Sequence, residues 1–170
     1  MGSTLLAAQG FQLAQSLVEE ESLDTARRIL AEADQTLVLP KDVVIADRLS
    51  ADASHRVIAV GDVPSGWQIV DVGPQTIDLF EDRLQHAKAV VWNGPVGVFE
   101  IEPFAQGTFS LARILSRLDA TTIVGGGDTA AAVHQAGVAE QMTHVSTGGG
   151  AFLAFIQGEE LPGLAALDDK

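Results

Sequence analysis

The sequence contains no cysteine and no long apolar run. Without cysteine the chain can form neither a disulfide nor a thiolate metal site, and it suits any redox compartment. No apolar run reaches the roughly 18–20 residues of a membrane span. The segment Met1–Gly10 shows neither the basic nor the apolar region of a secretory signal. These features lead us to expect a cytoplasmic location and no membrane partner.

Positive charge is also scarce. Ten Lys and Arg residues stand against 23 Asp and Glu residues, which gives a formal net charge of −13. Binding to a phosphate backbone needs clustered Lys and Arg, so nucleic acid is excluded as an expected partner. The only lysines are Lys41, Lys88 and Lys170. A phosphate site away from them would depend on backbone N–H groups, a metal ion or lysines from outside this chain.

The composition is that of a globular protein. Hydrophobic residues make up 46% and charged residues 19% of 170 residues. This balance argues against disorder, and the length suggests one domain. A chain of this size can bury about 70% of the surface that it exposes when unfolded.

The apolar pattern alternates between helix-like and strand-like segments. Residues 4–34 have helical spacing, and Ser22 or Asp24 is a candidate N-cap of a second helix there. Further helices are expected at 75–86, 104–118, 128–135 and 151–157. Short apolar runs predict strands at 36–39, 43–46, 56–60, 68–72, 89–92, 121–124 and 143–146. Apolar strands alternating with helices indicate an α/β fold with a mainly parallel sheet covered on both faces.

Two glycine triplets, Gly125–Gly127 and Gly148–Gly150, each lie between an expected strand and an expected helix. Glycine there permits positive φ and lets a ligand approach the backbone, and a helix N-terminus favours phosphate. Tight connections alone would also explain the glycines. Asp128 follows the first triplet, where a carboxylate can serve as an N-cap or hold Mg²⁺ beside a phosphate.

The segment 92–100 leaves another expected strand and makes a turn. Asn93 could donate a hydrogen bond to a phosphate oxygen, and Glu100 could accept hydrogen bonds from ribose hydroxyls. A Gly-Pro turn with an asparagine cap is the alternative interpretation.

These motifs resemble those of the phosphoglycerate kinase family. The resemblance is carried by residues 91–100 (VWNGPVGVFE), 122–130 (TIVGGGDTA) and 144–151 (HVSTGGGA). Residues 39–43, 46–47, 66–67 and 71–74 also fit the family, and 161–167 resembles the end of that family's chain. The motifs occur in the family's order and extend over nearly the whole chain.

The resemblance implies the later part of a Rossmann-like, three-layer αβα nucleotide-binding domain, here incomplete, over residues 1–170. The implied ligands are ADP or ATP with Mg²⁺. It places Asn93, Gly94, Pro95 and Val96 beside the nucleotide and Glu100 at the ribose. The implied phosphate-binding residues are Gly126, Gly127, Asp128 and Thr129, with Asp128 near Mg²⁺. The implied catalytic residues, which would stabilise the transferring phosphoryl group, are Gly127, Gly149 and Gly150.

The departures from the family pattern concern what the chain lacks. The family's amino-terminal domain, which binds 3-phosphoglycerate or 1,3-bisphosphoglycerate, has no counterpart here. Neither does the Gly-Gly-x-Lys-Val stretch that starts the nucleotide domain. We expect an intact, monomeric relative to transfer a phosphoryl group between 1,3-bisphosphoglycerate and ADP, and this chain alone to be inactive. Two alternatives are a nucleotide-binding module without catalysis and a structural piece that needs a complementary fragment to fold.

Overall fold

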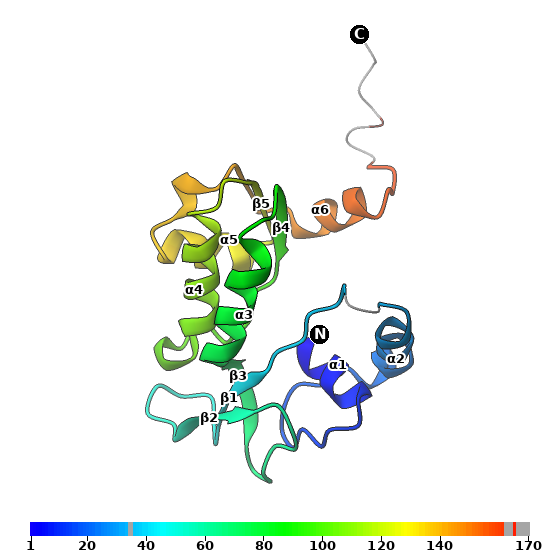
Figure 1. The fold of residues 1–170 in the computed structure, drawn as a ribbon, viewed down its shortest axis with the longest axis vertical. Helices are drawn as coiled ribbons and strands as arrows, with labels where there is room; N and C mark the ends of the chain where they lie inside the picture. The colour runs from blue at the N-terminus through cyan, green and yellow to red at the C-terminus, as the bar shows by residue number, and fades with distance from the viewer. Residues whose placement is uncertain (34–35, 162–164, 166–170) are drawn as a thin grey trace. The chain divides into compact units, whose positions relative to one another are not determined.

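The computed structural model describes residues 1–33, 36–161 and 165, and its chain divides into two compact units (Figure 1). The first unit comprises Met1–Asp82 and Val96–Thr108, and the second comprises Arg83–Pro95 and Phe109–Lys170. No helix within the described residues is long and apolar enough to cross a membrane. The expected family motif at 161–167 lies mostly outside the described residues.

The helices that open the first unit are shorter than the apolar spacing predicted. They are α1 (Gly2–Ala8), the 3-10 helix η1 (Glu20–Ser22) and α2 (Leu23–Glu32). Helix α1 ends where the chain enters left-handed backbone at Gly10 (φ +103°), so the prediction of helix is wrong for the stretch between α1 and η1. Ser22 occupies the N-cap position of α2, although its side chain makes no capping hydrogen bond.

The strands of the first unit form an antiparallel sheet in the order β2-β1-β3. They are β1 (Asp42–Ala46), β2 (His55–Ala59) and β3 (Gln68–Val72). These three strands are therefore separate from the parallel sheet that the alternating strands and helices predict. Only residues 47–54 connect β1 to β2, whereas a parallel crossover needs a dozen or more residues. The apolar sequence of β1 reflects its central position, which buries Val43, Ile45 and Ala46.

The predicted strand at 36–39 is also absent. Thr36 lies in a turn and residues 37–39 have no regular structure. Pro40, which follows them, has no backbone N–H to donate to a neighbouring strand. The antiparallel ladder begins only at Asp42, which pairs with Ala59.

Helix α3 (Pro74–Leu84) is joined to β1 by a buried carboxylate. The Asp42 carboxylate accepts hydrogen bonds from the backbone N–H groups of Gln75 (3.1 Å) and Thr76 (2.8 Å). It also accepts one from the Thr76 hydroxyl (2.7 Å). Two N–H groups that α3 cannot satisfy internally therefore have a partner from the neighbouring strand.

The second unit contains the parallel sheet that the sequence predicts. Its strands are β4 (Ala89–Asn93), β5 (Thr121–Gly125) and β6 (His144–Ser146), paired in the order β4-β5-β6. The α-helices that follow β4, β5 and β6 are α4 (Gln106–Leu115), α5 (Gly127–Gln135) and α6 (Gly149–Ile156). Two 3-10 helices lie between these elements: η2 (Glu102–Phe104) before α4 and η3 (Ala139–Gln141) after α5. The α/β class with a parallel sheet flanked by helices is thus confirmed.

The apolar core of the first unit lies around the antiparallel sheet. One cluster contains Leu6, Leu13, Val43, Ile45 and Val63. A second cluster contains Ala46, Ala53, Val70 and Phe104, and it fixes η2 because Phe104 is fully buried.

Candidate nucleotide-binding site

The three expected ligand-binding motifs leave the same edge of the parallel sheet. Asn93 pairs in register with Gly125, and Gly125 pairs with Ser146, so β4, β5 and β6 end in one row. The carboxyl edge of a parallel sheet is where open α/β folds bind ligands. The structure therefore brings the 93–94 turn and both glycine triplets to one place.

The two glycine triplets touch each other. The Gly126 N–H donates a hydrogen bond to the Ser146 carbonyl (3.1 Å), which links the end of β5 to the end of β6. A Cβ placed on Gly149 would lie 3.0 Å from the Gly126 Cα. Gly126 also has a φ of +98°, a conformation that glycine adopts at little cost. The backbone angle thus accounts for glycine at 126, and the close approach to Gly126 accounts for glycine at 149.

The turn after β4 is fixed against the start of α5. The Gly94 N–H donates to the Thr129 hydroxyl oxygen (2.8 Å), and the Trp92 indole N–H donates to the Gly94 carbonyl (2.7 Å). The Asn93 amide is exposed and lies beside Gly126: a Cβ built on Gly126 would be 3.7 Å from Asn93 Oδ1. Thr129 itself is fully buried, so its hydroxyl serves the protein by holding this turn.

The start of α5 presents backbone N–H groups that have no acceptor among the described residues. The first hydrogen bond of this helix runs from the Ala130 N–H to the Gly126 carbonyl (2.9 Å). The N–H groups of Gly127, Asp128 and Thr129 therefore precede the helical ladder, at the positive end of the helix dipole. Gly127 and Asp128 are exposed. This arrangement can bind an anion through backbone groups without a lysine.

The start of α6 offers fewer donors than the sequence suggests. The Gly149 N–H donates to the Thr147 carbonyl (3.1 Å), so it is already engaged in the protein. Gly150 is exposed, and a Cβ built on it would meet nothing within 4 Å. Of these two predicted residues, Gly149 brings α6 close to α5 and Gly150 faces open space.

Asp128 is the one predicted metal ligand. It is exposed and occupies the second position of α5. Within the described ranges, no group of three or more His, Cys, Asp or Glu residues could hold a metal ion. A single carboxylate beside a phosphate site nevertheless fits Mg²⁺, which commonly takes one or two carboxylates and completes its shell with phosphate oxygens and water.

The remaining predicted residues continue the chain from Pro95 into the first unit, where Val96 and Glu100 lie. The Val96 and Gly97 N–H groups both donate to the Thr108 hydroxyl oxygen, each at 3.2 Å. Glu100 is exposed, as a group that accepts hydrogen bonds from a ligand must be. The loop that carries it is therefore held by its own unit.

Asp71, the first residue of the 71–74 family match, received no role from the sequence, and it holds this same loop. Its carboxylate is buried and accepts hydrogen bonds from the backbone N–H groups of Gly107 (2.7 Å) and Val72 (2.9 Å). Burial raises the pKa of Asp71 to about 6, although these two N–H donors oppose the shift. An aspartate inside an apolar strand, two residues before a Gly-Pro pair, is the signal that could have indicated its role.

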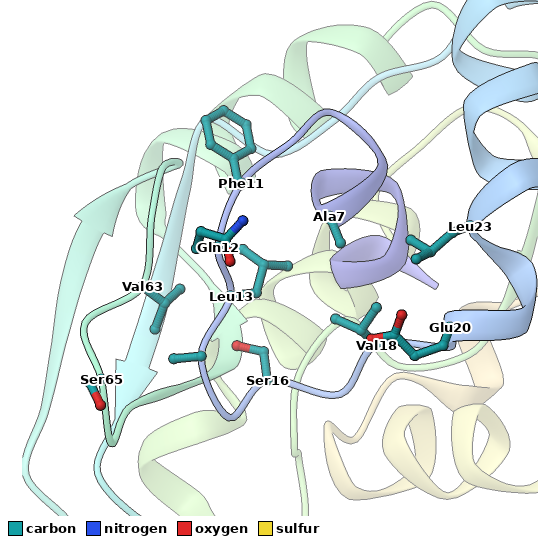
Figure 2. A pocket seen from close by; sticks show the side chains of 11 residues that line it. Ala7, Phe11, Gln12, Leu13, Ser16, Val18, Glu20, Leu23, Val63 and Ser65 are labelled. Carbon is teal, nitrogen blue, oxygen red and sulfur yellow. The ribbon is translucent and has the colours of Figure 1, made fainter.

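A separate hollow of about 580 Å³ lies within the first unit (Figure 2). It is lined from α1, the segment after α1, the start of α2 and the 63–65 turn, by residues such as Phe11, Leu13 and Val63. None of the predicted site residues lines it.

Comparison with known proteins matches residues 1–159 to the family model described as phosphoglycerate kinase. The chain belongs to the phosphoglycerate kinase family. The phosphoglycerate kinase of Chloroflexus aggregans is 51% identical over 175 residues, a match that covers 99% of this chain and 44% of that protein. The phosphoglycerate kinase of Limosilactobacillus reuteri is 50% identical, with 100% and 42% covered.

Solved phosphoglycerate kinase structures agree with this assignment. The structure from Coxiella burnetii superposes with a TM-score of 0.91 at 45% identity, covering 96% of this chain and 43% of that one. The structure from Pyrococcus horikoshii gives a TM-score of 0.85 at 32% identity, covering 98% and 42%. The chain thus spans less than half the length of the family members that it matches.

Proposed function

We propose that the chain is the later part of the nucleotide-binding region of a phosphoglycerate kinase and that it binds ADP or ATP. The observation that carries this proposal is the convergence of the 93–94 turn and both glycine triplets at the carboxyl edge of β4, β5 and β6. Family membership supports the identity of the nucleotide. We also propose a cytoplasmic location, because ADP and ATP are available there.

In this proposal the phosphates lie at the start of α5. The N–H groups of Gly127 and Asp128 would donate to phosphate oxygens, and Asn93 would add a side-chain donor. Thr129, which is buried, would contribute by holding the 93–94 turn against the phosphate site. Gly126 would let the phosphates approach the backbone, while Gly94, Pro95 and Val96 would border the nucleotide. Glu100 would accept hydrogen bonds from the ribose hydroxyls.

Asp128 would hold Mg²⁺ together with phosphate oxygens and water. Bound Mg²⁺ would neutralise phosphate charge during transfer. The chain's own part is positional, since phosphoryl transfer depends mainly on alignment and charge stabilisation. Gly127 and Gly150 would supply backbone donors to the transferring group, and Gly149 would keep α6 close enough to α5 for both to reach it.

For the complete protein we propose reversible phosphoryl transfer between 1,3-bisphosphoglycerate and ADP. The 170-residue chain covers 44% of a full-length relative, and no predicted residue in it binds the phosphoglycerate. We therefore expect the chain alone to bind nucleotide without turnover. A coupled assay that follows NADH oxidation tests this, and robust turnover by the purified chain would contradict it.

Calorimetric titration with Mg-ADP tests the binding step. The wild-type chain should bind, and Asp128→Asn should weaken binding of Mg-ADP more than binding of ADP in EDTA. Asp119→Asn is the matched control, because Asp119 is fully exposed and contributes only a surface ion pair with Lys88 (3.3 Å). If no protein gives a heat of binding, the result favours the alternative that the chain is a structural piece that needs a complementary fragment to fold. A cooperative thermal melt of the chain alone would contradict that alternative.

A further inference from the structure

The loop from Gly97 to Gly107 has both of its ends against the carboxylate of Asp71. A Cβ built on Gly97 would lie 2.2 Å from Asp71 Oδ1, and one built on Gly107 would lie 2.3 Å from the same oxygen. Such distances leave no room for any side chain at either position. The buried Asp71 carboxylate therefore lies between the two ends of one loop and contacts both of them.

The contacts are attractive as well as close. Asp71 Oδ2 accepts the Gly107 N–H at 2.7 Å. This bond holds the far end of the loop, at the second residue of α4, where a helix has no internal acceptor for its N–H. Hydrogen bonds to a buried carboxylate are stronger than those between neutral groups.

Four further contacts hold the loop within the first unit. The Val98 N–H donates to the Val70 carbonyl (2.8 Å), one residue before Asp71. Thr108 accepts the N–H groups of Val96 and Gly97. Phe104, in the middle of the loop, is fully buried in the core. Glu100 is exposed on this loop, and contacts hold both ends and the middle of the loop in place.

From these contacts we propose that Asp71 is a positioning residue, which sets the place of Glu100 for the ribose hydroxyls by holding both ends of the 97–107 loop. This inference rests on the proposed nucleotide binding and deepens it. Asp71 is 1% exposed and does not itself touch a ligand, so it would act only through the loop.

Amide hydrogen exchange tests the loop contact without any ligand. Asp71→Asn keeps the size of the side chain but leaves it with one acceptor oxygen in place of two. We expect exchange in residues 97–107 to rise by about tenfold, because one backbone N–H loses its acceptor. Asp78→Asn, an exposed site on α3 in the same unit, should leave exchange in that loop unchanged. Unchanged exchange in Asp71→Asn would overturn the inference.

The second measurement separates positioning from general destabilisation. It compares the affinities for Mg-ADP and Mg-2′,3′-dideoxy-ADP, which differ only in the ribose hydroxyls. The wild-type chain should prefer ADP by roughly tenfold. Both Glu100→Gln and Asp71→Asn should lose most of this preference, and the double variant should lose no more than either. A purely structural role would weaken both ligands equally and leave the ratio intact.

The outcomes separate nucleotide binding by the chain from the positioning role of Asp71. Failure of the wild-type chain to bind ADP overturns the proposed function, and hydrogen exchange then decides the loop contact on its own. Wild-type preference for ADP that persists in Asp71→Asn overturns the positioning role alone.

If Asp71→Asn does not fold, Thr108→Val removes two other loop contacts. It should also reduce the preference for ADP, and Thr108→Ser should restore it. An unchanged ratio in Thr108→Val would overturn the inference.

Discussion

Gly126 and Gly149 belong to different glycine triplets, and their backbones are in contact. A methyl group on Gly149 would lie 3.0 Å from the Gly126 Cα and 3.7 Å from the Gly126 nitrogen. We expect Gly149→Ala to push α6 away from α5, to lower the free energy of unfolding by about 1–2 kcal/mol and to weaken Mg-ADP binding. Gly150→Ala is the matched control, since its methyl group would meet nothing within 4 Å. Equal effects of the two variants would contradict the contact.

Gly126 and Gly127 provide a second matched pair, this time for backbone conformation. Gly126→Ala would force a side chain onto a residue with a φ of +98°, which costs on the order of 1–3 kcal/mol. Gly127 lies at the first position of α5 with open space around it. Gly127→Ala should leave stability unchanged or raise it by up to about 1 kcal/mol.

Urea titration followed by Trp92 fluorescence measures these changes in the second unit. A Trp67→Phe background removes the only other tryptophan. Comparable losses of stability in both alanine variants would show that the backbone angle of Gly126 is not the cause.

Asp71 should make the stability of the chain depend on pH. Its pKa is raised to about 6 by burial, above the value near 3.9 of an unfolded aspartate. Its contribution to stability is therefore fully present below about pH 4 and is lost as pH rises through about 6. The shift corresponds to an effect on the order of 1–3 kcal/mol.

Thermal melts between pH 4 and 7 test this dependence. The wild-type chain should lose stability relative to Asp71→Asn as pH rises, because asparagine does not ionise. The comparison cancels the titration of the four histidines, which both proteins share. Parallel stability curves for the two proteins would contradict the assignment.

The sequence predicted the ligand-binding edge better than it predicted the first sheet. The triplets and the 93–94 turn are local signals, and parallel pairing brings them together once the strands are recognised. Strand direction in the first unit depends on which strands meet, and the apolar run at 43–46 shows only that β1 is buried. Asp71 belongs to the 71–74 family match, but its role could not be predicted because it depends on Gly97 and Gly107, which are distant in the sequence.

The second unit leaves apolar side chains exposed on β4 and α6. Val91 on β4 is 52% exposed, and on α6 Phe155 is 64% and Ile156 54% exposed. No residue of α6 is buried. Strand β4 pairs only with β5 among the described strands, so its other edge carries free backbone groups. Such a surface favours pairing with another chain.

We therefore expect the 170-residue chain to self-associate at micromolar concentrations. Light scattering after size-exclusion chromatography should show a mass that rises with protein concentration. Val91→Lys places a charge on the β4 edge and should shift the chain toward the monomer. Val57→Lys is the matched control, because Val57 is 49% exposed on β2 of the first unit. A concentration-independent monomer would contradict the expectation, and equal effects of the two lysine variants would show that charge alone, and not the β4 edge, governs association.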